Sequence, residues 1–172
     1  NIQFLDIDES KINSLKKHQP PFFEPELADY LNNKEILENV NFSSEYKNIA
    51  WDNVDIVMVC VQTPSLESNQ IDTSFVKKVF MSIQNYINDN TVVCIKSTIH
   101  PEALEKIVAD LSFDHSRIVF NPEFLREGSA FTDFFQPDRI VIGSTDKENA
   151  EKVGLLYKNL DVNYTGYDAY KK

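Results

Sequence analysis

The stretch VDIVMVCVQTP at residues 54–64 is the clearest strand signal in this chain of 172 residues. Residues 54–61 are largely apolar and rich in β-branched side chains, and Thr63-Pro64 ends the run, which is typical of a buried strand. Similar but shorter runs predict further strands at residues 2–6, 39–42, 91–95, 117–120, 139–142 and 162–164.

Between these runs, apolar residues recur at helical spacing, which predicts helices. They are expected at residues 9–17, 25–31, 43–51, 72–87, 101–111 and 145–160. Pro25 and Pro101 fit the first turns of two of them, and Thr145 fits the cap of the last. Strands that alternate with helices predict an α/β fold, with a doubly wound, mostly parallel sheet in a single domain.

The glycine content is low and unevenly distributed. The four glycines are Gly128, Gly143, Gly154 and Gly166, and the first 127 residues contain none. The G-x-G-x-x-G dinucleotide fingerprint and the P-loop both need closely spaced glycines, so the sequence contains neither motif. The net charge of −10, from 17 basic and 27 acidic residues, argues against nucleic acid and anionic membranes as partners.

Several other classes of protein are also excluded. A membrane-spanning helix needs about 20 apolar residues, and every apolar run in this sequence is much shorter. No signal peptide is visible either, so we expect a cytoplasmic protein. Cys60 and Cys94 lie in strand-like apolar runs and are expected to be buried, reduced thiols. The cysteines and the three histidines lack the spacing of zinc ligands, so no metal site is predicted.

Polar residues follow four of the predicted strands. These sets are Asp6-Ile7-Asp8, Gln62-Thr63-Pro64-Ser65, Lys96-Ser97-Thr98 and Asn121-Pro122-Glu123. Because ligands bind beyond the carboxyl ends of strands in such sheets, we expect the four sets to converge on one edge.

Taken alone, each set has an ordinary structural explanation. Asp6 could accept hydrogen bonds from an adenosine ribose flanked by Lys11, or it could cap the following helix. Ser97 and Thr98 suit a polar ligand or an ordered water, or they could cap the helix that begins near Pro101.

Residues 121–128 carry two carboxylates four positions apart. If this segment is helical, Glu123 and Glu127 share a face, and their proximity would raise the pKa of one of them. Arg126 would then pair with a carboxylate or bind phosphate, although a charged helix start explains the same residues. The phenylalanines that follow, at residues 131, 134 and 135, are expected in the core.

Residues 121–128, followed by Pro137-Asp138-Arg139-Ile140-Val141-Ile142-Gly143, resemble the signature of the UDP-glucose/GDP-mannose dehydrogenase family. Four further matches occur in the family's order. They are Leu5-Asp6-Ile7-Asp8 with Lys11, Phe23-Glu24-Pro25, Val61-Gln62-Thr63-Pro64 and Lys96-Ser97-Thr98. The resemblance extends from residue 2 to about residue 143, and more weakly to residue 165. It implies a Rossmann-like NAD-binding domain.

The family oxidises the C6 hydroxyl of a nucleotide sugar to a carboxylate with two NAD⁺, through an aldehyde and a thioester held on a cysteine. By resemblance, Glu123 is the acid/base, and Thr98 helps to hold the catalytic water. Residues implied to contact NAD are Asp6, Lys11, Val61, Gln62, Thr63, Pro64, Ser65, Ser97, Thr98, Ile99 and Glu127. Residues implied to line the sugar pocket are Glu123, Phe124, Leu125, Arg126 and Glu127.

The sequence also departs from the family pattern. It begins after the family's first strand and glycine-rich loop, it ends before the central helix and the domain with the nucleophilic cysteine, and His100 replaces a usual proline. We therefore expect part of an NAD-dependent, homo-oligomeric enzyme of this family that acts on UDP-glucose. We also expect that the chain lacks complete turnover and has unpaired strand edges. A non-catalytic remnant or regulatory module is the alternative, and GDP-mannose or a UDP-N-acetyl-hexosamine is the alternative substrate.

Overall fold

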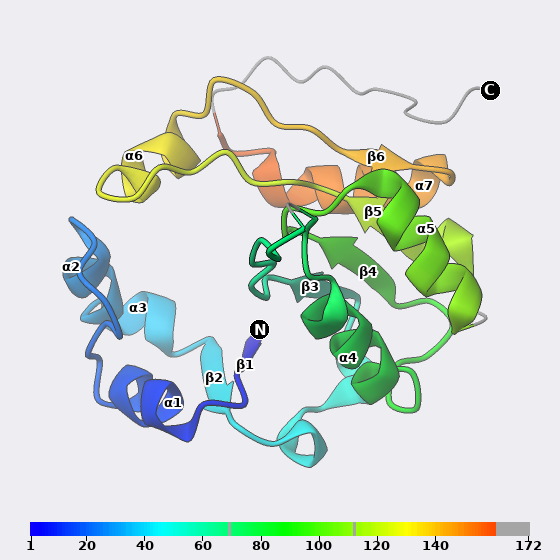
Figure 1. Cartoon of the computed structure of the whole chain (residues 1–172). Coiled ribbons are helices and arrows are strands. Elements are labelled where there is room, and N and C mark those ends of the chain that lie inside the picture. The colour runs from blue at the N-terminus through cyan, green and yellow to red at the C-terminus, as the bar shows by residue number, and fades with distance from the viewer. Residues whose placement is uncertain (69, 112, 161–172) are drawn as a thin grey trace. The chain divides into compact units, whose positions relative to one another are not determined.

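The computed structural model describes residues 1–68, 70–111 and 113–160 (Figure 1). The chain divides into two compact units. The first unit contains residues 1–50 and 125–137, and the second contains residues 51–124 and the chain from residue 138 onward. The strand predicted at residues 162–164 lies outside the described residues.

The first unit is built on two parallel strands. Its elements are β1 (Ile2–Leu5), α1 (Glu9–Lys16), α2 (Leu27–Leu31), α3 (Lys34–Leu37), β2 (Val40–Ser43) and α6 (Ala130–Phe135). β1 pairs with β2 in parallel, with Ile2 opposite Val40. α1 begins where the Asp8 side chain accepts hydrogen bonds from the amides of Ser10 and Lys11. The strands and α1 confirm the sequence-based expectations.

Three predictions for the first unit and the segment after it are wrong. The helix expected from Pro25 begins at Leu27, because Glu26 has a φ of +68° and its backbone is left-handed rather than helical. The helix expected at residues 43–51 is replaced by two 3₁₀ turns, Tyr46–Asn48 and Trp51–Asn53. The phenylalanines of α6 do not form a core, because α6 packs by one side against Tyr30 and leaves Phe134 and Phe135 39% and 37% exposed.

The second unit contains a four-stranded sheet in the order β3-β4-β5-β6. Its strands are β3 (Ile56–Val59), β4 (Val92–Ile95), β5 (Ile118–Phe120) and β6 (Gly143–Ser144). Its helices are α4 (Ser74–Ile83), α5 (Pro101–Asp110) and α7 (Lys147–Gly154). The first three strands are parallel, as predicted, and β6 is antiparallel to β5. The mostly parallel α/β sheet is thus confirmed.

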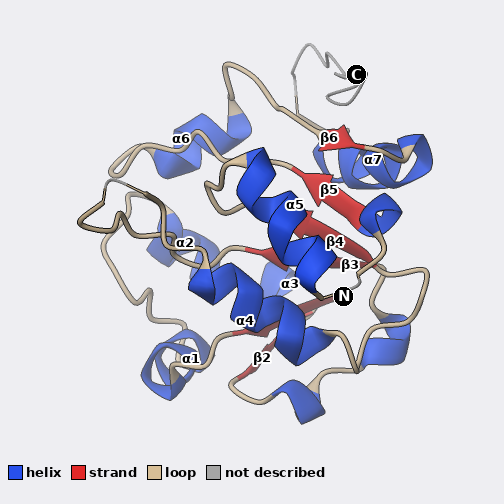
Figure 2. Cartoon of the chain, turned by 45° about the vertical axis from the view of Figure 1, so that its right-hand side comes forward, coloured by secondary structure: helices blue, strands red, loops and turns tan. Residues whose placement is uncertain are grey.

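Helices cover both faces of this sheet (Figure 2). All four residues of the central strand β4 are buried. Cys94 faces the core cluster that contains Val153 of α7. On the other face, α4 and α5 lie side by side, joined by a Lys77–Asp110 ion pair of 2.9 Å. A central strand buried on both faces explains why its apolar run was easy to identify in the sequence.

The last part of the second unit departs from the predictions. Residues 139–142, expected as a strand, form none, and the ladder with β5 begins at Gly143. Ile142 is nevertheless buried, because it packs in the core cluster without pairing in the sheet. The final helix is capped by Asp146 rather than Thr145, and it ends in the 3₁₀ turn Leu155–Tyr157.

In the described residues, β1 pairs with β2 alone and β3 with β4 alone, so each of these strands has one edge without a ladder partner. Low stability or pairing through these edges stays a prediction. Within the same residues, no helix is long and apolar enough to span a membrane.

Candidate functional site

A polar pocket of about 170 Å³ lies beyond the carboxyl ends of β3 and β4 in the second unit. The residues that line it are Cys60, Val61, Gln62, Thr63, Lys96, Ser97, Thr98 and Glu123. The pocket thus brings together members of three of the four polar sets predicted to converge. The fourth set, at Asp6, belongs to the first unit.

Ser97 fastens the ends of β3 and β4 together at this pocket. Its hydroxyl lies 2.6 Å from the carbonyl oxygen of Val61, and its amide donates to the carbonyl of Val59 at 3.1 Å. The residue is only 6% exposed. The Ser97 hydroxyl donates to backbone carbonyl oxygens, so it shapes the pocket wall, whereas the neighbouring Thr98 is exposed on the pocket.

Three residues of the second unit that were implied to contact NAD do not line the pocket. Pro64 and Ser65 are exposed and lead into a narrow loop, which is closed by a hydrogen bond of 2.8 Å from the Asp72 amide to the Pro64 carbonyl. The Ile99 side chain is 3% exposed and therefore belongs to the core.

The two cysteines differ in their surroundings. Cys94 is buried as predicted, but Cys60 is exposed and lines the pocket, because it follows the last residue of β3. Desolvation by the surrounding protein nevertheless raises the pKa of Cys60 to about 11, with Glu123 adding to the increase and Lys96 opposing it. Cys60 is therefore a neutral thiol at physiological pH rather than a nucleophile.

Glu123 is held by a buried anchor two residues before it. Asn121 is 1% exposed and donates from Nδ2 to the carbonyl of Val141 at 2.8 Å, while its Oδ1 accepts a hydrogen bond from the Tyr157 hydroxyl. Its own amide donates to the carbonyl of Ile95 in β4. The sequence placed Asn121 in a polar set expected at the ligand-binding edge, whereas the structure buries it. The sequence assigned no role to Tyr157, and the contact between the two residues spans 36 positions.

The segment that carries the two glutamates is not helical. Residues 121–126 have no helical turns, and a turn follows at residues 127–129. Glu123 and Glu127 therefore share no helix face, because the condition of that prediction, a helical segment, is not met. The physical reason is local: the Asn121 amide continues the pairing with β4, and Gly128 adopts a φ of +82°.

In the first unit, Asp6 and Lys11 lie side by side after β1. Asp6 accepts a hydrogen bond of 2.9 Å from the Asp8 amide, and its other oxygen is 3.5 Å from Lys11 Nζ. Since Asp8 is the helix cap, the alternative in which Asp6 caps α1 is excluded. Both side chains are partly exposed and could approach the same ligand.

Arg126 forms a network with Asp133 in the first unit. Its amide and Nε donate to Asp133 Oδ2 at 3.0 and 3.1 Å, and its Nη2 donates to Oδ1 at 2.6 Å. The Ser129 hydroxyl also donates to Oδ2, so the Asp133 carboxylate accepts four hydrogen bonds in all. Arg126 holds the pKa of Asp133 well below its usual range. Of the two functions left open for Arg126, the structure shows carboxylate pairing.

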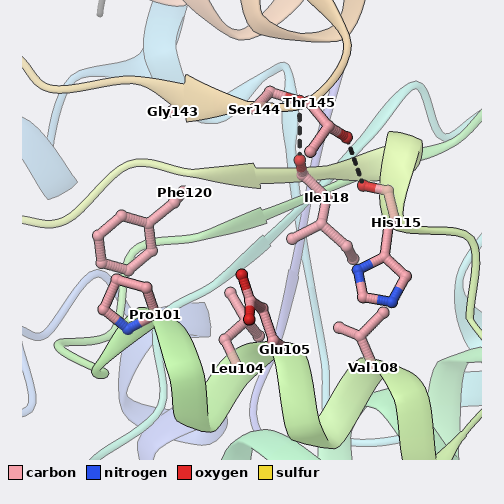
Figure 3. Close-up of a pocket in the computed structure, with 10 residues that line it drawn as sticks. All are labelled: Pro101, Leu104, Glu105, Val108, His115, Ile118, Phe120, Gly143, Ser144 and Thr145. Carbon is pink, nitrogen blue, oxygen red and sulfur yellow. Dashed lines mark hydrogen bonds between the residues drawn. The ribbon is translucent and has the colours of Figure 1, made fainter. Parts of the chain in front are cut away.

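A smaller pocket of about 60 Å³ lies between α5 and strands β5 and β6 (Figure 3). Its walls are mainly apolar, with Leu104, Val108 and Ile118 among them. None of the predicted site residues lines it. In the part of the chain that the structure describes, no group of three or more His, Cys, Asp or Glu could hold a metal ion.

Gly128 lies in the turn at residues 127–129, and its backbone conformation restricts which residues can replace it. Its φ of +82° disfavours other residues, although an added Cβ would meet no atom within 4 Å. We expect Gly128→Ala to lower the free energy of unfolding by about 1 kcal/mol, measured by urea denaturation. Gly128→Asn should cost less, because asparagine tolerates the left-handed region. Equal stability of the alanine variant and the unchanged chain would contradict this explanation.

A parallel α/β sheet with a polar pocket at the carboxyl ends of its strands defines the class of nucleotide-binding domains. Within that class, residues 1–161 match the NAD binding domain of the UDP-glucose/GDP-mannose dehydrogenase family. The chain belongs to this family, as its resemblance implied, and the matched region is the family's NAD-binding domain.

Curated and solved relatives agree with this assignment. UDP-glucose 6-dehydrogenase of Rickettsia felis is 37% identical over 165 residues, which cover 93% of this chain and 36% of the relative. UDP-glucose 6-dehydrogenase TuaD of Bacillus subtilis is 36% identical over 162 residues, which cover 89% and 34%. The structure of a UDP-glucose dehydrogenase from Pyrobaculum islandicum is 29% identical with a TM-score of 0.83, covering 95% of this chain and 40% of that one. The chain thus spans little more than a third of these curated relatives.

Proposed function

We propose that this chain provides the NAD-binding part of an enzyme that oxidises the C6 hydroxyl of UDP-glucose to a carboxylate in two NAD-dependent steps. The supporting observation is the pocket in which Thr98, Lys96 and Glu123 meet beyond β3 and β4. Hydroxyl and backbone groups at this edge fit a dinucleotide, and Lys96 supplies a local positive charge in a chain of net charge −10. NAD⁺ bound at this edge would supply the acceptor for the hydride of the alcohol carbon.

The chain's own residues have distinct roles in this proposal. Glu123 is exposed on the pocket and takes the proton of the alcohol as hydride leaves. Thr98 holds the water that Glu123 later activates. Val61, Gln62 and Thr63 line the cofactor side, and Ser97 holds their backbone in place. The segment from Phe124 to Glu127 faces the sugar, with Glu127 also near the nicotinamide.

Asp6 and Lys11 are proposed to hold the adenosine ribose. Asp6→Asn removes the charge of the acceptor but keeps the side-chain shape, and it should weaken NAD⁺ binding about tenfold, as measured by calorimetric titration. Glu9→Gln is the matched control, because Glu9 is an exposed acid in the first turn of α1. Unchanged affinity in Asp6→Asn would remove Asp6 from the cofactor site.

The function itself is tested with NAD⁺ and UDP-glucose. Calorimetric titration should detect binding of NAD⁺, while NADH formation from the two substrates should stay at background. The reason is that the described residues contain neither a glycine-rich pyrophosphate loop nor an activated cysteine. Robust turnover by this chain would contradict the need for further segments. Absence of NAD⁺ binding would favour a non-catalytic remnant or regulatory module, and tighter binding of GDP-mannose or a UDP-N-acetyl-hexosamine would change the substrate.

A further inference from the structure

The loop at residues 21–25 has an unusual distribution of side chains. Phe22 and Phe23 are 64% and 90% exposed, whereas the acidic residue Glu24 is half-buried. An exposed loop ordinarily has the reverse arrangement, with charged side chains outside and aromatic ones inside. The orientation of Glu24 therefore needs a specific partner to explain it.

That partner is the turn at the start of α6, more than a hundred positions along the chain. Glu24 Oε2 accepts a hydrogen bond from the Gly128 amide at 2.9 Å, and Oε1 accepts one from the Ala130 amide at 2.8 Å. All three residues belong to the first unit. Both carboxylate oxygens are thus used on one short stretch of backbone, and hydrogen bonds to an ionised acceptor are about twice as strong as neutral ones.

Hydrogen bonds also fix the start of the same turn, at Arg126. The Ser129 amide donates to the Arg126 carbonyl at 3.1 Å, so residues 126–129 form a turn with Gly128 in its third position. A positive φ there is the conformation that a type II turn requires. Asp133 holds the side chain and the amide of Arg126 at the first position. Glu127, the second residue, is held between these two anchors.

We infer that Glu24 is a positioning residue, which sets the turn that presents Arg126 and Glu127 to the nucleotide sugar. This inference rests on the proposed function for its ligand but not for its geometry. Glu24 does not touch the substrate in this arrangement and acts through the Gly128 and Ala130 amides. Without its carboxylate, Asp133 still holds Arg126, while the far side of the turn loses its anchor.

The geometric part is tested by NMR on the ligand-free chain. Glu24→Gln removes the carboxylate charge, so the Gly128 and Ala130 amide resonances should both shift relative to the unchanged chain. The two amides should also exchange with solvent about tenfold faster in the variant. Glu26→Gln is the control, since Glu26 makes no side-chain cap hydrogen bond. Gly128 and Ala130 amide resonances and exchange rates that stay the same in Glu24→Gln would overturn the inference.

The functional part is tested by UDP-glucose titration of the same variants. Glu24→Gln should weaken UDP-glucose binding about tenfold, and Glu24→Asp, which is too short to reach both amides, should fall between it and the unchanged chain. Circular dichroism confirms that the variants are folded. Altered amides with unchanged affinity would refute the positioning role. If the unchanged chain binds no UDP-glucose, the proposed function fails for this chain, and the amide data alone decide whether Glu24 sets the turn.

Discussion

Replacing Asn121 by alanine is expected to lower the free energy of unfolding by about 3 kcal/mol. The side chain is 1% exposed and joins the end of β5 to two segments further along the chain. It donates to the Val141 carbonyl and accepts from the Tyr157 hydroxyl. Alanine removes both contacts in a region that water cannot easily enter, and a buried polar group that loses its hydrogen bond costs more than the bond itself contributed.

Two variants separate this explanation from a general effect of mutation. Tyr157→Phe removes only the hydroxyl and should cost less, about 1 kcal/mol, because Asn121 keeps its bond to Val141. Asn41→Ala changes an exposed asparagine whose side chain contacts Gln3, and it should stay within about 0.5 kcal/mol. Urea denaturation of the single variants and the Asn121/Tyr157 double variant gives their coupling energy. A cost below about 1 kcal/mol for Asn121→Ala would contradict the proposed anchor.

The same anchor explains which features of the fold the sequence could predict. β4 was predictable because all of its residues are buried and apolar, so local composition reports directly on its position in the sheet. Residues 140–142 are equally apolar but form no strand, because the Val141 carbonyl bonds to the Asn121 side chain rather than to a neighbouring strand. An apolar composition indicates that a segment is buried, but it does not indicate which donor the backbone carbonyl groups of that segment bind.

Some features of the candidate site could likewise be predicted from the sequence, and others could not. Thr63, Thr98 and Glu123 meet in one pocket because parallel strands bring their carboxyl ends to one edge, a consequence of topology that the sequence pattern already contains. Glu123 and Glu127 share no helix face, because residues 121–126 form no helical turn. Spacing of four residues carries information only where the backbone is helical.

Long-range polar contacts were the features that the sequence could not provide. Glu24 belonged to a recognisable motif, yet nothing near it indicated that its partners are the amides of Gly128 and Ala130. Backbone amides have no sequence signature, since every residue except proline carries one. A charged side chain that binds amides is therefore visible only in the structure.

The free energy of unfolding is expected to fall steeply above about pH 9. The groups responsible are Cys94 and Tyr157, which belong to one core cluster. Burial raises the pKa of Cys94 to about 12 from 9.0, and it raises that of Tyr157 to about 12 from 10.0, with Cys94 adding to the second increase. Between about pH 9 and 12, the unfolded chain releases these protons while the folded chain retains them. Since the unfolded state then binds fewer protons, the free energy of unfolding decreases as the pH rises.

The size of the effect follows from the same linkage. A tenfold difference in acidity between folded and unfolded states corresponds to about 1.4 kcal/mol for each group, so the combined loss reaches several kcal/mol by about pH 12. Urea midpoints at pH 7, 9, 10 and 11 should be level at first and then decline. Cys94→Val should flatten the decline, whereas Cys60→Ser should flatten it less, because the pKa of Cys60 is raised only to about 11. An undiminished decline in Cys94→Val would show that the alkaline weakness arises elsewhere. A flattened decline in Cys94→Val would show that β4 is stable only while Cys94 remains a neutral thiol.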